Sequence, residues 1–304
     1  MSEYIIETNK LTKKFKNRYA VESVDLKIKQ GEIYGFLGPN GAGKTTTIRM
    51  LLGLARPTYG SIHIFGKDMR KEKLSVLRKV GALVEYPSYY GHLTAYENLE
   101  AIRILLDAPK SRIDEVLSIV RLSKEAKRPV KGFSLGMKQR LGIAAALLGD
   151  PKLLILDEPT NGLDPSGILE MRELIKRMPK EQGITIVVSS HLLSEIDQMA
   201  TQVGIISKGK MIFQDSIERL REKSTSKISV KVDEAEQAWR MLLSNGIQAE
   251  MENNQLYLPH CSDKAVAAVI SELIHHHFSV YRVEEEKRSL EDIFLELTGG
   301  GASL

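Results

Sequence analysis

A glycine-rich segment constrains the fold of this chain more than any other part of its sequence. The segment fits G-x-x-x-x-G-K-[ST], a pattern whose backbone N–H groups surround phosphates when a strand precedes it and a helix follows. The apolar run Ile33 to Leu37 precedes it and a helical pattern from Thr46 to Leu54 follows. We therefore predict a strand, a phosphate-binding loop and a helix, with the loop made of Gly38, Pro39, Asn40, Gly41, Ala42, Gly43, Lys44, Thr45 and Thr46.

The chemistry of this loop is anion binding. Its glycines let the backbone curl so that successive N–H groups point inward, where the helix N-terminus adds the positive end of its dipole. The ammonium of Lys44 suits the β- and γ-phosphates of a nucleotide, and the Thr45 hydroxyl can ligate Mg²⁺. The alternative is a glycine-rich turn without a ligand, which the flanking strand and helix disfavour.

A second motif places two adjacent carboxylates at the end of a strand. The apolar run Leu153 to Leu156 is typical of a buried strand, and Asp157 and Glu158 follow it. Ligands of α/β sheets bind at such strand ends. We expect Asp157 to hold Mg²⁺, through water, and Glu158 to polarise the attacking water. The alternative is a strand that ends in two solvated acids.

Short apolar runs that alternate with helical patterns indicate a largely parallel sheet covered by helices in the first part of the chain. Residues Val24 to Ile28 alternate apolar with polar, which predicts a half-buried strand and a small antiparallel layer. From about residue 90 to residue 150 the pattern is helical, with candidate helices Leu93 to Leu106 and Ile113 to Leu122. We interpret this part as an inserted helical subdomain.

The last part of the chain has a pattern of its own after a polar segment, residues 215 to 226. An alternating strand at 228 to 232, a helix through Trp239, a hairpin at 253 to 254, a helix at 264 to 275 and a strand at 280 to 283 follow. The order βαββαβ is that of a ferredoxin-like α+β domain. A final amphipathic helix includes Leu290 and Leu297, with capping-box spacing between Ser289 and Asp292. The expected boundaries are 1–222 and 223–304.

Composition excludes several classes of protein. The single cysteine, Cys261, forms no internal disulfide and no cysteine cluster for zinc, which fits a cytoplasmic setting. The net charge of +4 indicates no particular partner. No stretch approaches the roughly 18 apolar residues that cross a bilayer, so a membrane function needs another chain. We interpret His275 to His277 as a plain helix end, since consecutive helical positions cannot all face one ion.

The segment Phe133-Ser-Leu-Gly-Met137, between the two nucleotide motifs, resembles the signature loop of ABC ATPases. In that family the loop reads Leu-Ser-Gly-Gly-Gln and reaches across a dimer to the γ-phosphate of ATP on the opposite subunit. Ser134 and Gly136 match the pattern, whereas Leu135 and Met137 depart from it. The alternative, an ordinary helix start capped by Ser134, predicts the same local structure.

The resemblance extends over about the first 220 residues and implies further roles. Gly162-Leu-Asp164 corresponds to the D-loop at the dimer seam. His191 follows an apolar strand and resembles the switch histidine that contacts the γ-phosphate, although a lone histidine is more often structural. Phe15 resembles the aromatic residue that stacks on adenine, and would otherwise belong to the core. Glu85 replaces the usual glutamine near Mg²⁺ and the attacking water, so Glu85→Gln is expected to preserve ATP binding and to alter coupling to the membrane partner.

Glu85, the Ser-Leu-Gly-Met signature and the ending from Ser289 to Thr298 resemble the bacitracin- and lantibiotic-resistance branch of ABC exporters. The resemblance implies an ATPase at the inner face of the cell membrane, which forms an ATP-bound homodimer and drives a separate integral membrane subunit. The alternatives are a soluble ABC ATPase that acts on nucleic acid or ribosomes, which the single ATPase unit disfavours, and a regulatory module that hydrolyses poorly, which Glu158 disfavours.

Overall fold

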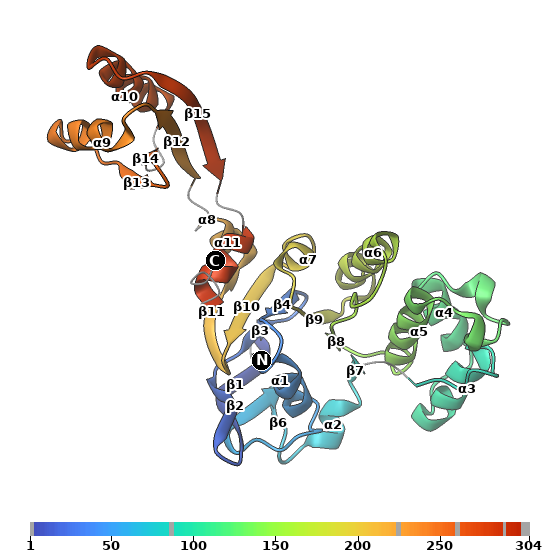
Figure 1. The fold of residues 1–304 in the computed structure, drawn as a ribbon. Helices are drawn as coiled ribbons and strands as arrows, with labels where there is room; N and C mark the ends of the chain where they lie inside the picture. Colours follow the sequence, from blue (N-terminus) through green and yellow to red (C-terminus); the bar gives the residue numbers. More distant parts are fainter. Residues whose placement is uncertain (1–2, 85–87, 223–225, 259–261, 288–289, 299–304) are drawn as a thin grey trace. The chain divides into compact units, whose positions relative to one another are not determined.

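The computed structural model describes residues 3–84, 88–222, 226–258, 262–287 and 290–298. The chain divides into two compact units, Met1–Ile217 and Glu218–Leu304 (Figure 1). Each unit has a sheet and a core of its own, and the two are described in turn. In the described ranges no helix has both the length and the apolar character that a bilayer span requires.

A six-stranded sheet forms the centre of the first unit. Its order is β11-β10-β4-β9-β8-β7, in which β11 is antiparallel to β10 and the other neighbours are parallel. Strands β4 and β8 are buried along their whole length, as continuous apolar runs predict. The strands are β4 (Ile33–Leu37), β7 (Val80–Leu83), β8 (Leu153–Asp157), β9 (Thr185–Ser190), β10 (Gln202–Ser207) and β11 (Lys210–Ser216). The predicted parallel sheet is thereby confirmed.

The predicted antiparallel layer is also present, but the strand expected from Val24 to Ile28 is interrupted at Asp25 and Leu26 and is not one continuous strand. The chain leaves the β1–β2 ladder at Val24 and joins the other half of β1 only at Lys27, because β1 pairs with two different strands along its length. Leu26, between them, is buried and its N–H donates to the Thr8 hydroxyl instead of a strand ladder. The layer consists of β1 (Tyr4–Phe15), β2 (Arg18–Val24), β3 (Lys27–Lys29), β5 (Tyr59–Ile64) and β6 (Lys67–Asp68).

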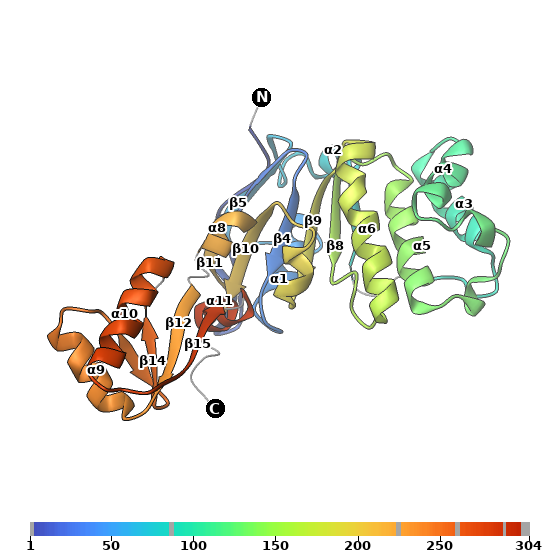
Figure 2. The ribbon, with the colours of Figure 1, turned by 90° about the horizontal axis from the view of Figure 1, so that it is seen from above.

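Helix α1 (Lys44–Leu51) connects the two sheets through one apolar core. Its residues Ile48, Met50 and Leu51 join a cluster that includes side chains from the antiparallel layer and from β4, β8 and β9. Helices α6 (Pro165–Gln182) and α7 (Leu193–Asp197) pack on the six-stranded sheet (Figure 2), and α2 (Lys73–Leu77) lies beside β7. The six-stranded sheet is therefore packed against α1 and the antiparallel layer, and also against α6 and α7. This packing fixes the positions of the carboxyl ends of β4, β8 and β9.

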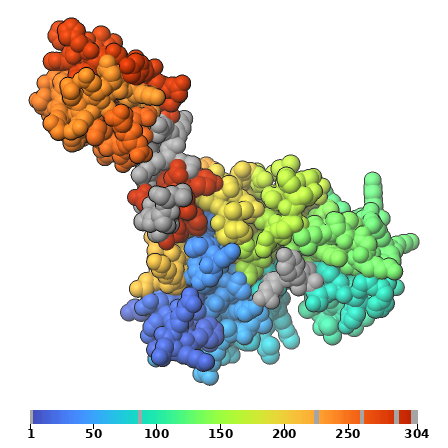
Figure 3. Space-filling model, in the orientation of Figure 1, coloured from blue at the N-terminus to red at the C-terminus, as the bar shows by residue number. Residues whose placement is uncertain are grey.

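The segment expected to be helical contains α3 (Ala95–Leu106), α4 (Ser111–Ile119) and α5 (Leu135–Leu147), with short 3-10 turns at Ser123–Glu125 and Val130–Gly132. Thr94 and Glu97 form a capping box at the start of α3. Helix α5 packs against β7, and the segment (green in Figure 3) lies at the surface of the first unit.

The second unit has the expected element order. Helix α8 (Ile217–Glu222) leads to β12 (Ser226–Val232), α9 (Ala235–Ser244), β13 (Glu250–Glu252), β14 (Gln255–Leu258), α10 (Asp263–His275), β15 (Val280–Lys287) and α11 (Leu290–Thr298). Its sheet is antiparallel throughout, in the order β13-β14-β12-β15. Val230, Leu242, Leu256 and Leu273 form the centre of its core. Ser289 of the expected capping box lies outside the described residues.

Candidate functional site

The phosphate loop lies between β4 and α1, and its glycines are required by close packing. Gly43 has φ +113°, and a Cβ atom there would lie 2.5 Å from the carbonyl oxygen of Ala20. At Gly38 a Cβ atom would lie 2.3 Å from the carbonyl oxygen of Ile206. Helix α1 begins directly after Gly43, so its first N–H groups have no partner within the helix and can bind an anion.

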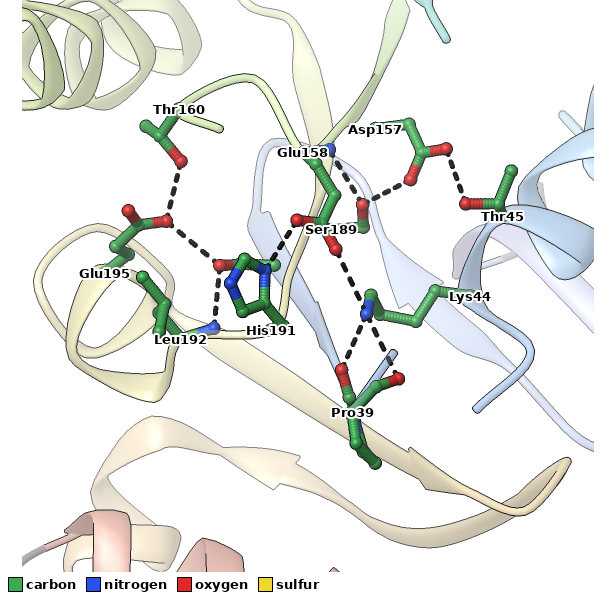
Figure 4. A network of polar contacts seen from close by, with 12 residues as sticks. Pro39, Lys44, Thr45, Asp157, Glu158, Thr160, Ser189, His191, Leu192 and Glu195 are labelled. Carbon is green, nitrogen blue, oxygen red and sulfur yellow. Dashed lines mark hydrogen bonds and ion pairs between the residues drawn. The ribbon is translucent and has the colours of Figure 1, made fainter. Parts of the chain in front are cut away.

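The side chain of Lys44 is held at this loop by three oxygens. Its Nζ donates to the carbonyl oxygen of Gly38 at 2.6 Å and lies 3.4 Å from that of Pro39. It also forms an ion pair with Oε1 of Glu158 at 3.1 Å (Figure 4). Lys44 is only 6% exposed, so this pairing compensates much of the desolvation of its charge. The ammonium is therefore positioned between the loop and the end of β8.

Asp157 is joined to the loop by a second set of polar contacts. The Thr45 hydroxyl donates to Oδ2 of Asp157 at 2.8 Å, and the Ser189 hydroxyl donates to Oδ1 at 2.5 Å. Ser189 in turn accepts the N–H of Glu158 at 2.9 Å. The hydroxyl of Thr45 and the carboxylate of Asp157 are oxygen ligands of the kind that Mg²⁺ prefers. Among the described residues no three His, Cys, Asp or Glu side chains gather around one point.

Glu158 faces different partners from its neighbour Asp157. Its backbone has φ +51°, a left-handed conformation that is uncommon for a residue with a side chain. Oε1 contacts Lys44, while Oε2 lies 2.7 Å from Nδ1 of His191. The two adjacent carboxylates therefore take separate positions, one beside Thr45 and one between a lysine and a histidine.

A pocket of about 360 Å³ opens over the phosphate loop. Phe15 is 54% exposed at its rim, so it is not a core residue. It lies across a tight hairpin from Arg18, and this cross-strand pairing brings Arg18 to the pocket. The lining residues are Phe15, Arg18, Ala20, Pro39, Asn40, Gly41, Gly43, Lys44, Thr45, Thr46 and Glu158.

The segment Ser134 to Met137 does not line this pocket. Ser134 caps α5 by accepting the N–H of Met137 at 3.2 Å, and its side chain is exposed. A Cβ atom at Gly136 would meet only Leu163, at 3.7 Å, so the backbone there is accessible next to the 162–164 turn. The structure thus brings the phosphate loop, Asp157, Glu158 and His191 together and leaves the 134–137 loop apart. Glu85 lies outside the described residues.

Several polar residues of this region were missed from the sequence. Ser189 joins Asp157 to the backbone of Glu158, and Glu195 accepts hydrogen bonds from Thr160 and Ser190. The pair Ser189-Ser190 directly before His191 was a visible signal for the first of these. Tyr89 donates its hydroxyl to the carbonyl oxygen of Lys138 in α5, and burial raises the pKa of the Tyr89 hydroxyl.

Comparison with known proteins agrees with this geometry. Residues 21–161 match the family model of the ABC transporter. The bacitracin transport ATP-binding protein BcrA of Bacillus licheniformis is 46% identical over 300 residues, which cover 98% of each chain. The lantibiotic transport ATP-binding protein SrtF of Streptococcus pyogenes is 45% identical over 221 residues, which cover 72% of this chain and 95% of that protein.

Solved structures show the same fold. The structure of cbiO1 from Clostridium perfringens, part of the ABC transporter complex cbiONQ, has a TM-score of 0.68 and 27% identity, and covers 80% of this chain and 96% of its own. A dimeric post-hydrolysis structure of the ATP-binding cassette MJ0796 with ADP and Pi has a TM-score of 0.63 and 26% identity. The match covers 70% of this chain and 98% of the MJ0796 chain. The chain therefore belongs to the ABC transporter family, as an ATP-binding subunit that hydrolyses ATP.

Proposed function

We propose that this ATPase powers a separate integral membrane subunit that exports, or protects the cell from, a peptide antibiotic of the bacitracin or lantibiotic type. The similarity to BcrA supports this proposal because it extends over both compact units of the chain, and not only over the phosphate-binding part. The place of action is then the inner face of the cell membrane, where the ATPase binds its membrane partner as a homodimer.

Co-purification with a co-expressed membrane subunit, combined with growth in bacitracin or nisin, tests this function. We expect the complex to be isolated in detergent and to raise the tolerated antibiotic concentration. A Lys44→Ala variant is the matched control, because it removes the charge that faces the phosphate loop and should still co-purify with the membrane subunit. Recovery with RNA or DNA in place of a membrane protein, and no change in tolerance, would contradict the proposal.

The contacts of Lys44, Glu158 and His191 are the observation that supports specific roles in hydrolysis. Lys44 binds the β- and γ-phosphates as a positive charge, next to the N–H groups of α1. Thr45 and Asp157 would hold Mg²⁺, which when bound neutralises charge on the phosphates. Glu158 accepts a hydrogen bond from the attacking water and takes up its proton as general base.

His191 is assigned a second contact with the terminal phosphate in this proposal. Its Nδ1 is engaged by Glu158 at 2.7 Å, which leaves Nε2 for a phosphate oxygen. The Glu158 carboxylate is thereby oriented from two sides, by Lys44 and by His191. Phe15 stacks on the adenine ring at the rim of the same pocket.

The signature loop completes the site of a second copy of the chain. The Ser134 hydroxyl and the backbone at Gly136 are accessible at the N-terminus of α5, where the helix dipole favours an anion. These residues do not line the pocket over their own phosphate loop, which supports assigning the phosphate that they bind to ATP on the opposite subunit. Two ATP molecules are then enclosed in the closed dimer, and hydrolysis reopens it.

The small unit is a ferredoxin-like domain in this proposal, with the domain boundary between residues 222 and 223. Its element order and the sheet order β13-β14-β12-β15 support the assignment.

Glu85 would approach Mg²⁺ and the attacking water in place of the usual glutamine. For Glu85→Gln we expect unchanged ATP affinity and an altered number of ATP molecules hydrolysed per exported molecule, measured with the reconstituted transporter.

A further inference from the structure

Glu195 is a buried carboxylate that none of the roles above uses. It lies on α7, four residues after His191, and is 8% exposed. Its Oε2 accepts a hydrogen bond from the Thr160 hydroxyl at 2.7 Å and another from the Ser190 hydroxyl at 3.0 Å. Within the described part of the chain, no cationic side chain forms an ion pair with it, so the two hydroxyls are its side-chain partners (Figure 4).

The two hydroxyl donors come from the segments that follow neighbouring strands. The ladder of backbone hydrogen bonds between β8 and β9 ends at the pair Asp157 and Ser189. Beyond this pair the segments that follow the two strands are no longer paired as strands. Thr160 is 5% exposed and begins the turn that leads to the D-loop, since its carbonyl oxygen accepts the N–H of Leu163. Ser190 is 2% exposed and directly precedes His191. Glu195 therefore joins the D-loop segment to the histidine segment after the backbone ladder has stopped.

The direction of each hydrogen bond is determined by the chemistry of the groups. Ser190 donates its hydroxyl hydrogen to Glu195 and accepts the N–H of Leu192 at 3.0 Å. The turn from Ser190 to Leu192, which contains His191, is consequently closed by side-chain bonds alone. A carboxylate suits this position because it accepts both hydroxyl hydrogens without a competing proton.

We propose that Glu195 is a positioning residue that holds the D-loop segment and His191 in one geometry relative to Glu158. The part-buried contact between His191 and Glu158 and the buried contacts of Glu195 join the same two segments. Glu195 touches neither the phosphate loop nor the nucleotide pocket, so its effect is on the chemical step and not on ATP affinity. The inference rests on the proposed roles of Glu158 and His191.

Steady-state ATP hydrolysis by the purified full-length chain tests the proposal. Thr160→Val keeps the shape of the side chain and removes one donor, while Glu195→Ala removes the acceptor of both. We expect both variants to lower kcat on the order of ten- to a hundredfold, as removal of orienting groups around a reactive site does, with KM for ATP within about twofold of the wild type. Glu195→Gln retains an amide oxygen that accepts both bonds and should restore most of kcat.

Thr185→Val is the matched control. Thr185 is a fully buried threonine at the opposite end of β9, and its hydroxyl oxygen accepts the N–H of Gly31 at 2.8 Å. The variant should lower the melting temperature as Thr160→Val does, but leave kcat of the folded protein unchanged. The proposal is overturned if Thr160→Val lowers kcat no more than Thr185→Val, if KM rises as kcat falls, or if Glu195→Gln is as impaired as Glu195→Ala.

Failure of this inference can be told from failure of the proposed site. If Glu158→Gln abolishes hydrolysis while Thr160→Val is normal, the roles of Glu158 and His191 stand and the positioning role of Glu195 is wrong. If Glu158→Gln is fully active, the site assignment itself is wrong.

Discussion

Two regions of the first unit carry phosphate-binding groups, and they differ in how completely the chain satisfies them. Around the phosphate loop, Lys44, Asp157 and Glu158 each have side-chain partners, and these contacts are buried or part-buried. At the start of α5, the Ser134 side chain is exposed, and Gly136 is half-buried with Leu163 as the nearest neighbour that a Cβ atom there would meet. The first region is a preorganised binding site, whereas the second is an accessible surface.

The difference shows what each region needs in order to act. A set of charges that the fold already holds in place binds ATP at a lower cost of reorganisation, because much of its desolvation has already been compensated within the fold. An accessible helix N-terminus gains specificity only when another molecule brings an anion to it. The comparison therefore predicts that substitutions around the phosphate loop abolish ATP hydrolysis or ATP affinity. Substitutions at the start of α5 are predicted to abolish the association of two copies of the chain.

The largest effect is expected from Glu158→Gln. Loss of a general base lowers rates by about 10²- to 10⁴-fold, so turnover should nearly vanish while ATP binding remains. The variant should accumulate as an ATP-bound dimer in size-exclusion chromatography. A monomeric and fully active variant would contradict the role of Glu158 and remove the distinction between the two regions.

Gly136→Asp tests the second region by itself. A carboxylate near the N-terminus of α5 is favourable for the helix but repels a phosphate, so the fold should persist and the dimer should be lost. Hydrolysis should fall on the order of a hundredfold, as when one oxyanion donor is removed, without a change in ATP affinity. Gly136→Ala is the control, since a Cβ atom fits there with its nearest contact at 3.7 Å. A variant that dimerises normally with ATP would show that this surface is not part of the site.

Phe15→Ala should have a smaller effect, on affinity only. Stacking of a base on an aromatic ring contributes about 1 to 3 kcal/mol, so the Kd for ATP should rise by roughly tenfold with little change in kcat. Titration with a fluorescent ATP analogue measures it, and Phe15→Trp should retain the wild-type affinity. Equal loss of affinity for inorganic triphosphate would mean that Phe15 does not contact the base.

Removal of the residues after Thr225 should have the smallest effect on nucleotide binding. The two units have separate cores, so the first should keep its fold and its Kd for ATP, measured by the same titration. Loss of ATP binding in the truncated chain would show that the second unit is part of the nucleotide site.

The predictable part of the fold was the part governed by local pattern. Continuous apolar runs indicated β4, β8 and β9, since strands buried on both faces need apolar side chains at every position. The break between β2 and β3 could not be predicted, because it depends on β1 pairing with a different strand in each half. Local alternation of apolar and polar residues contains no information about such a change of partner.

The same distinction applies to the candidate site. Lys44, Asp157 and Glu158 follow from motifs whose spacing reflects a loop and a strand end. Arg18 and Glu195 were missed, because each reaches its place through tertiary contacts: Arg18 across a hairpin from Phe15, and Glu195 by hydrogen bonds to Thr160 and Ser190. A polar residue on a short helix has the same appearance in sequence whether it is solvated or buried.

Local sequence patterns were enough to predict a phosphate loop, two carboxylates at a strand end and a signature-like loop. Glycine, lysine and threonine at fixed spacing suffice for that, since these residues act through the local backbone. Only the tertiary structure decided that Glu158 contacts both Lys44 and His191, and that the Ser134 to Met137 loop lies outside the pocket over its own phosphate loop. These contacts depend on the order of the strands in the sheet. That order is set by pairing between segments that are far apart in the sequence.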